Sequence, residues 1–322
     1  MANLPKVNLD IPRWDQNTYM GRVKYFLSTT NPLNLLATPK QLEKAKDIVT
    51  KYRCGDMLHQ DITMEDVYRA KDLYDSAFHP ESGRKMFFIG RMSAQVPINM
   101  FITGGLLMFY DSYIGVIFWQ WVNQSFNAIV NYTNRSGDSK LPLRQLLISY
   151  ILATGGALAT ALSFNQIVVN APHLVRQCVP FVGVAAANCI NIPLMRFQEL
   201  KHGIPVVDDL NRQIGISKKA AFIAICSVVC SRMVMVLPGL TFSPIVVHFL
   251  EDSGYIKKEQ KIQYAILQTF LCGFFLALAT PMACAVFSQR SKISIDKLEQ
   301  DLQEKIQDLV PKPELVFYNK GL

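Results

Sequence analysis

The sequence predicts an all-α membrane protein with about five transmembrane helices, an N-terminal helical soluble segment and a C-terminal amphipathic helix. Half of its 322 residues are apolar and only 18% are charged, whereas an ordinary soluble domain carries about 25% charged residues. The apolar residues are also segregated, because the long apolar runs lie between residues 97 and 287. We therefore expect a soluble helical segment at 1–96, a transmembrane domain at 97–287 and an amphipathic tail at 288–322.

The segment 1–96 predicts two amphipathic helices. Thr38 followed by Pro39 is typical of a helix start, and apolar residues then recur on one helical face as far as Tyr52. A second helix is expected from Thr63 onward. Pro80 ends it, because proline disfavours a helical conformation in the residue before it. These helices predict a cap on the membrane domain rather than a catalytic domain.

The first apolar stretch of the membrane domain, residues 97–119, is interrupted by Asp111 and Ser112. A carboxylate at the middle of a bilayer costs about 2.5–3.5 kcal/mol. Either Asp111 faces the interior of the helix bundle, or the stretch is a shorter helix, a turn and a second helix. The sequence leaves both arrangements open.

Four further apolar stretches predict the remaining spans. They lie at residues 146–169, 175–194, 220–249 and 264–287. Each is near the ~20 residues that a bilayer requires. Five spans place the two termini on opposite sides of the membrane. The positive-inside tendency then places the C-terminus on the side whose loops are richer in Lys and Arg.

The tail after Ser294 predicts an amphipathic helix. Its apolar face consists of Ile295, Leu298, Leu302, Ile306 and Leu309. Residues at these spacings share one side of a helix. Two prolines, Pro311 and Pro313, are expected to end it.

The formal net charge of +8 does not indicate a nucleic-acid partner. The segment 1–96 carries 14 Lys and Arg against 11 Asp and Glu, and the tail from residue 288 carries six of each. The rest of the surplus is spread over loops and spans, without a run of five basic residues. Nucleic-acid binders concentrate their basic residues on one face. We therefore expect basic loops beside the headgroups of a lipid bilayer.

The most informative polar pattern is a stripe of carboxamides at Gln120, Gln124, Asn127 and Asn131. In a helix these residues fall at i, i+4, i+7 and i+11, which is a single face. Carboxamides both donate and accept hydrogen bonds, so this face suits a neutral or zwitterionic solute better than a bare ion. The structural alternative is a helix end at the membrane interface whose polar face is simply hydrated.

Asn188 and Asn191 add polar side chains inside an expected span. They lie at i and i+3, and Pro193 follows two residues later. Polar groups within a span are costly unless they are paired or line a cavity. A proline frees backbone carbonyls, and transporters use such broken helices in their binding sites. The alternative role is a hydrogen bond between packed helices.

Arg232 and Thr280 complete the candidate substrate-binding residues. Arg232 stands alone in the fourth span, where it requires a carboxylate, either that of Asp111 or that of a bound solute. Thr280 precedes Pro281 in the fifth span, so a hydroxyl coincides with a break in the backbone hydrogen bonds. The sequence fits a structural Arg232–Asp111 pair as well as a contact with solute.

No pattern of an enzyme, a cofactor site or a metal site accompanies these residues. The sequence lacks a phosphate-binding Gly-x-x-x-x-Gly-Lys loop and a Gly-x-Ser-x-Gly motif. Its five histidines and seven cysteines do not fall at metal-ligand spacings. We therefore expect no catalysis, no cofactor and no bound metal.

Several longer motifs resemble those of the sideroflexin family. They are Pro12-Arg-Trp-Asp-Gln16, Tyr74-Asp-Ser-Ala-Phe-His-Pro80, Ile89-Gly-Arg-Met-Ser93, Phe118-Trp-Gln-Trp121, Asn123-Gln-Ser-Phe-Asn127, Asn191-Ile-Pro-Leu-Met-Arg196 and Asn319-Lys-Gly-Leu322. The resemblance runs from about residue 9 to the C-terminus. Glu81-Ser82 stands where the family has Asp-Thr, and Ser288 stands where it usually has proline. These departures leave the paralogue open.

The resemblance implies a multi-span protein of the mitochondrial inner membrane that enters without a cleaved presequence. It implies transport of small neutral amino acids, serine first and alanine or cysteine as further substrates, to supply one-carbon metabolism in the matrix. The alternative is a membrane scaffold that assembles respiratory complexes with inner-membrane protein partners, or a role in iron homeostasis. A carrier of citrate is disfavoured, because only Arg176 and Arg232 fall within the apolar spans.

Overall fold

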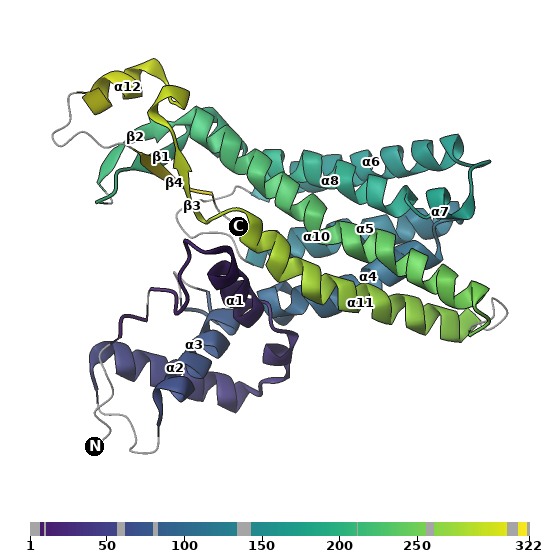
Figure 1. Ribbon diagram of the computed structural model, residues 1–322, viewed down its shortest axis with the longest axis horizontal. Coiled ribbons are helices and arrows are strands. Elements are labelled where there is room, and N and C mark those ends of the chain that lie inside the picture. Colours follow the sequence, from purple (N-terminus) through teal and green to yellow (C-terminus); the bar gives the residue numbers. More distant parts are fainter. Residues whose placement is uncertain are drawn as a thin grey trace.

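The computed structural model describes residues 7–9, 11–56, 62–79, 83–133, 143–210, 212–255, 261–307 and 315–320. A long bundle of apolar helices carries further helices and a small β-sheet at one of its ends (Figure 1). We call the end with the sheet the sheet end, and the opposite end the distal end.

Three α-helices form the N-terminal part. They are α1 (Tyr19–Thr29), α2 (Pro39–Cys54) and α3 (Met64–Ala77), with the short helix η1 (Pro32–Leu36) between the first two. The helices predicted from Thr38 and Thr63 are present as α2 and α3. Each begins with a capping box, in which the threonine and a side chain three residues later bind each other's backbone amides. Val49 and Val67 are buried where α2 packs on α3. Pro80 lies outside the described residues.

Six helices form the bundle among the residues that the structure describes. They are α4 (Gln95–Met108), α5 (Tyr113–Thr133), α6 (Leu143–Ile167), α8 (Val179–Met195), α10 (Lys218–Asp252) and α11 (Lys261–Val286). By length and composition, three of these helices could cross a membrane, namely α6, α10 and α11. The chain is therefore a membrane protein, while the predicted number of five spans is not confirmed. Helices α4 and α8 have 14 and 17 residues, fewer than the ~20 that a full bilayer crossing requires.

The interrupted first apolar stretch is two helices rather than one span. Helix α4 ends at Met108, residues 109–112 make the turn, and α5 begins at Tyr113. Asp111 lies exposed in this turn, and its carboxylate pairs with Arg176 of the short helix α7 (His173–Arg176). The second of the two arrangements left open by the sequence is therefore correct, and the postulated Arg232–Asp111 pair is not.

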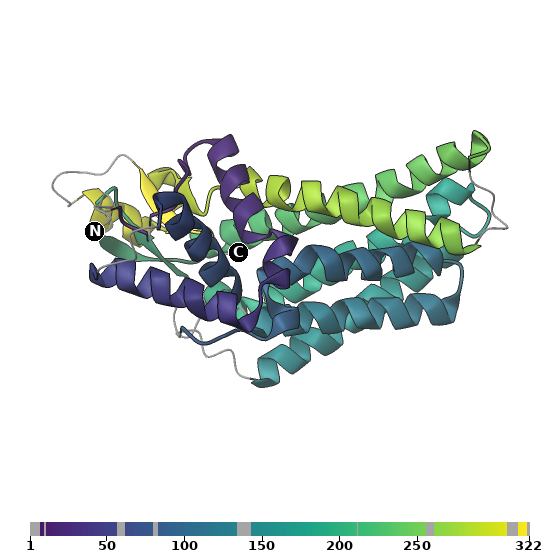
Figure 2. The same cartoon turned by 90° about the horizontal axis from the view of Figure 1, so that it is seen from below.

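Both the N-terminal helices and the C-terminal strand lie at the sheet end, which favours termini on one side of the membrane over the predicted opposite sides. Tyr19 Oη donates to the Met282 carbonyl at 3.2 Å, and Lys320 Nζ donates to the Phe287 carbonyl at 3.3 Å. Both acceptors lie where α11 ends, and Figure 2 shows α1 crossing this end of the bundle. The predicted span at 97–119 divides into α4 and the first part of α5, so one predicted pass corresponds to two helices of the bundle. Including α5 makes the number of passes along the bundle even.

A four-stranded antiparallel sheet corrects the prediction of an all-α fold. Its strands are β1 (Ile204–Val207), β2 (Gln213–Ser217), β3 (Arg290–Ile293) and β4 (Val316–Asn319), in the order β2-β1-β4-β3. Strands of four or five residues are too short to show a clear alternation in the sequence. Val206, Val316 and Ala220 are buried in one core, so the sheet packs on the start of α10. The sheet joins the connection between α8 and α10, which includes α9 (Phe197–His202), to the tail of the chain.

The amphipathic helix predicted after Ser294 is shorter than expected. It consists of the single turn η4 (Ile295–Lys297) and α12 (Gln300–Gln307). Leu298, Leu302 and Ile306 are buried in the core of the sheet, so the predicted apolar face packs on protein. Leu309 and the two prolines lie outside the described residues.

Candidate functional site

A narrow cavity lies inside the bundle between α4, α5, α8, α10 and α11, with a volume of about 30 Å³. We call it the inner cavity. Its polar lining consists of Gln95, Asn99, Thr103, Asn123 and Thr280. The described part of this lining includes no Asp, Glu, Lys or Arg side chain. The inner cavity is therefore polar but uncharged.

Helix α4 supplies most of this polarity from one face. Gln95, Asn99 and Thr103 follow at i, i+4 and i+8, on one side of a helix that is otherwise apolar. Gln95 Nε2 and Asn123 Nδ2 are buried and have no hydrogen-bond acceptor among the described residues. Buried polar groups in proteins are normally hydrogen-bonded, so these amides are available to a polar guest. The regular spacing on α4 is a sequence signal that was missed, because residue 95 was assigned to the soluble segment.

A second cavity, also of about 30 Å³, lies nearer to the sheet end. We call it the mouth cavity. It shares Gln95, Met235 and Thr280 with the inner cavity. Helix α10 lines the mouth cavity over residues 228–235 and the inner cavity over residues 235–240. The two cavities therefore follow one another along α10.

Two of the predicted site residues meet at the mouth cavity. Arg232 of α10 and Thr280 of α11 both line it, and Thr280 lines the inner cavity as well. Ser231 and Lys320 line the mouth cavity too, and the sequence analysis singled out neither. No spacing in a sequence connects residue 320 with residue 232, since only the fold of β4 brings them together.

The carboxamide stripe of α5 faces a different neighbour. Gln120 and Gln124 are buried, and both Gln120 and Ala161 of α6 lie against Gly183 of α8. Neither the Nε2 nor the Oε1 atom of Gln120 has a hydrogen-bond partner within the described ranges. Asn123 is the residue of α5 that lines the inner cavity, and it does not belong to the stripe. Gln120 therefore lies where α5 meets α6 and α8, and no residue of the stripe is among the described residues that line the two cavities.

The other four predicted residues do not join Arg232 and Thr280. Asn127 and Asn131 are half-buried further along α5 toward the sheet end, and Asn188 is half-buried on α8. Asn191 is buried on α8. None of the four is among the described residues that line the two cavities.

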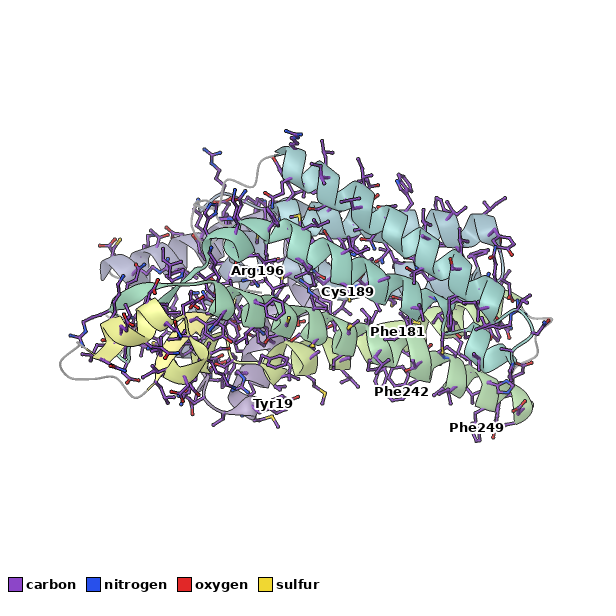
Figure 3. All side chains as sticks on the ribbon, turned by 90° about the horizontal axis from the view of Figure 1, so that it is seen from above. Tyr19, Phe181, Cys189, Arg196, Phe242 and Phe249 are labelled. Carbon is purple, nitrogen blue, oxygen red and sulfur yellow. The ribbon has the colours of Figure 1, made fainter. Side chains whose placement is uncertain are left out.

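Two basic side chains line the mouth cavity and two more, Arg22 and Arg196, lie close to Lys320. Arg22 Nε donates to the Ala285 carbonyl at 2.8 Å, and Arg196 binds the carboxylate of Glu199. Arg232 and Lys320 line the cavity, and neither is in an ion pair with a carboxylate in the part of the chain that the structure describes. Figure 3 shows Arg196 at the sheet end of the bundle.

Lys320 is the most buried of these cations, with 4% of its surface exposed. Burial lowers the pKa of its amine, and the neighbouring Arg196, Arg22 and Arg232 lower it further, while Cys284 acts in the opposite direction. The mouth therefore gathers several positive charges, of which Arg196 alone is paired with a carboxylate among the described residues. An anionic group that entered would relieve this repulsion.

The outer surface of the bundle is apolar. In Figure 3, Phe242 and Phe249 project outward from α10, and 51% and 69% of their surfaces are exposed. Exposed aromatic side chains in such a helix are typical of a surface that faces lipid. The polar groups described above thus lie inside a bundle whose exterior suits a bilayer.

Comparison with known proteins assigns the chain to one family. A model of the family described as "Sideroflexins" matches residues 8–322. The protein named Sideroflexin-1-3 from Drosophila melanogaster is 52% identical over all of both chains. Human Sideroflexin-3 is 50% identical over all of both chains, and human Sideroflexin-1 is 49% identical over 99% of this chain and 98% of its own. No solved structure matches.

Proposed function

This chain belongs to the sideroflexin family, and we propose that it transports small neutral amino acids, serine first, across the mitochondrial inner membrane. The observation that supports the proposal is the line of two cavities along α10, lined by carboxamides and hydroxyls and with cations only at the mouth. Transported serine supplies one-carbon metabolism in the matrix.

The chemistry of the lining suits a zwitterion with a small polar side chain. Arg232 provides a guanidinium for the carboxylate, since charge-assisted hydrogen bonds are stronger than neutral ones. Gln95, Asn99 and Asn123 provide carbonyl oxygens that accept from an ammonium group and amides that donate to a hydroxyl. Asp111 has no part in this scheme, because it pairs with Arg176 at the distal end.

The size of the cavities implies that transport requires movement of the helices. Each cavity has a volume of about 30 Å³, and a single water requires roughly 10–15 Å³, so neither admits an amino acid as it stands. Three of the helices around the cavities contain internal prolines, namely Pro193 in α8, Pro238 and Pro244 in α10, and Pro281 in α11. Each proline removes one backbone hydrogen bond from its helix, which makes these positions candidates for bending.

One alternative solute is favoured by the cations at the mouth, namely a di- or tricarboxylate such as citrate. The fold brings Arg22, Arg196 and Lys320 to Arg232, although all three lie outside the predicted spans. Arg22 is held by backbone carbonyls and Arg196 by Glu199. The two remaining cations match a single carboxylate, so a neutral amino acid ranks first.

The test is uptake of labelled L-serine by liposomes that contain the purified protein, with alanine and citrate as competitors. We expect saturable uptake that alanine inhibits and citrate does not. Inhibition by citrate in place of alanine would favour the carboxylate carrier. Uptake no higher than in empty liposomes, from protein shown to be folded, would rule out the proposal.

Arg232→Gln tests the role of the guanidinium in the same assay. A hydrogen bond to a charged group contributes about 1.5–3 kcal/mol, so we expect the KM for serine to rise by roughly 10- to 100-fold. Arg144→Gln is the matched control, because Arg144 is an exposed arginine at the start of α6. Equal KM values for the two variants would contradict the assignment.

A further inference from the structure

We infer that Lys320, at the end of β4, is the second carboxylate-binding residue of the transport pathway, acting together with Arg232. This inference rests on the proposed function, since it specifies how that pathway recognises its solute. It also assigns a binding role to the C-terminal strand, which the sequence indicated only as an amphipathic tail.

The backbone holds Lys320 in place from two sides. Its amide donates to the Gln289 carbonyl at 2.8 Å, which extends the pairing of β4 with β3. Its own carbonyl accepts from Arg196 Nη1 at 2.8 Å. The residue is thus fixed between the tail of the chain and the junction of α8 with α9.

The side chain enters the mouth cavity from this fixed backbone. Its ammonium lies 5.6 Å from the centre of the Phe287 ring and donates to the Phe287 carbonyl at 3.3 Å. An ammonium has three N–H donors, and this carbonyl is the sole acceptor for them among the described residues. Two donors therefore have no acceptor in the described part of the chain, and a carboxylate in the cavity would accept them.

The charge balance at this place indicates the kind of group that binds. A buried cation is stable in proteins when it is paired with an anion, yet Lys320 is surrounded by Arg22, Arg196 and Arg232. Among the described side chains, Glu199 is the carboxylate that binds one of these four cations, and its partner is Arg196. A carboxylate between Lys320 and Arg232 would compensate two charges at once.

The arrangement also predicts what the pathway rejects. Cationic solutes meet a mouth with uncompensated positive charge, and no described acidic residue lines either cavity. Like charges at short distance in a poorly hydrated site repel strongly. The pathway therefore selects solutes that carry a carboxylate. It accepts neutral amino acids and rejects their amides, which lack this group.

A purely structural role is the competing explanation, because a lysine at the C-terminal end of a helix stabilises the last carbonyls. The two roles differ in what substitution changes. A helix-capping lysine affects the stability of the protein and the amount of active transporter. A carboxylate-binding lysine affects the KM and the preference for solutes with a carboxylate.

The experiment compares Lys320→Met, Lys320→Arg and Lys305→Met with the wild type, as full-length protein in liposomes. Lys305 is an exposed lysine of the same tail and serves as the matched control. Labelled L-serine is the transported solute, and L-serine and L-serinamide are the unlabelled competitors. Thermal unfolding of each variant in detergent is measured alongside.

We expect Lys320→Met to raise the KM for serine by about 10-fold and to reduce the preference for serine over serinamide, with little change in Vmax. Lys320→Arg keeps the charge and is expected to retain the wild-type preference. Wild-type transport with an unchanged KM and preference in Lys320→Met would overturn the inference and leave the proposed function intact. A lower Vmax and unfolding temperature with an unchanged preference would establish the capping role instead.

Discussion

Asp208 stabilises the turn between β1 and β2 by accepting three hydrogen bonds. Its carboxylate accepts from the amides of Leu210 and Arg212 at 2.9 and 2.8 Å, and from Arg212 Nε at 2.7 Å. Burial favours the neutral acid, but the hydrogen bonds from Arg212 and Leu210 outweigh it and hold the pKa of Asp208 below its ordinary value of 3.8. The folded state therefore favours the ionised carboxylate.

A folded-state pKa below the unfolded one makes the contribution of Asp208 depend on pH in a defined direction. The stabilisation is present above pH ~4, the unfolded pKa, and is lost as the pH falls through the lower folded pKa. We expect Asp208→Asn to lower the unfolding temperature at pH 7 and to lower it less at pH 3. Asp209→Asn is the control, since Asp209 is exposed in the same turn. A deficit in Asp208→Asn that does not shrink at low pH would contradict this account.

At the scale of elements, α5 packs against α6 and α8 through small residues that leave room for Gln120. A Cβ on Gly183 would lie 2.5 Å from Gln120 Nε2 and 2.9 Å from the Cβ of Ala161. Both separations are shorter than van der Waals contact, so the helices would have to move apart or Gln120 would have to change rotamer. The glycine is therefore required by the buried carboxamide.

Gly183→Ala is expected to destabilise the protein by about 1–3 kcal/mol, the usual cost of overpacking a core. Gly155→Ala is the matched control, because Gly155 also lies inside a bundle helix but has no atom within 4 Å of its added Cβ. Alanine favours a helix over glycine by up to ~1 kcal/mol, so the control should be unchanged or more stable. The measurement is thermal unfolding in detergent, and similar effects of the two substitutions would disprove the packing argument.

The elements that could be predicted from the sequence are those with a local signal. The helix starts at Thr38 and Thr63 and the long apolar runs of α6, α10 and α11 predicted helices that the structure contains. Helix α1 and the sheet were not predicted. The strands have only four or five residues, and the sheet closes through the pairing of β1 with β4, in which Val206 meets Tyr318 from the far end of the sequence. Such pairings depend on the assembled bundle and leave no local pattern.

The residues of the candidate site also divide into those with a local signal in the sequence and those without one. Arg232 and Thr280 could be predicted, because a charge or a Thr-Pro step is conspicuous in an apolar run. Gln95 was missed at the edge of a span, and Lys320 was missed because its position depends on the sheet. The stripe headed by Gln120 was correctly seen as one helical face, but a sequence does not show which neighbour a face meets.

At the scale of the whole molecule, the even number of passes predicts a topology that labelling can test. Cys54 of α2 and a cysteine at Lys305 of α12 lie at the sheet end, whereas a cysteine at Ser253 lies at the distal end. Each is placed as the single cysteine of an otherwise cysteine-free variant in sealed vesicles and treated with a membrane-impermeant maleimide. We expect Cys54 and Lys305→Cys to react from one side of the membrane and Ser253→Cys from the other. Reaction of Cys54 and Lys305→Cys from opposite sides would restore the arrangement with an odd number of spans.

The shared position of the N-terminal helices and the C-terminal strand has a consequence for how the protein is made. Helices α4 and α5, α6 and α8, and α10 and α11 form three hairpins, each of which begins and ends at the sheet end. A hairpin can enter a bilayer from one side while only its tip crosses. Asp111 lies at the tip of the first hairpin and Arg176 at the tip of the second, and their charges neutralise each other. Helices α2 and α3 and the sheet never have to cross the membrane. Insertion machinery on a single side of the membrane therefore suffices, and the sheet can close once the third hairpin is in place.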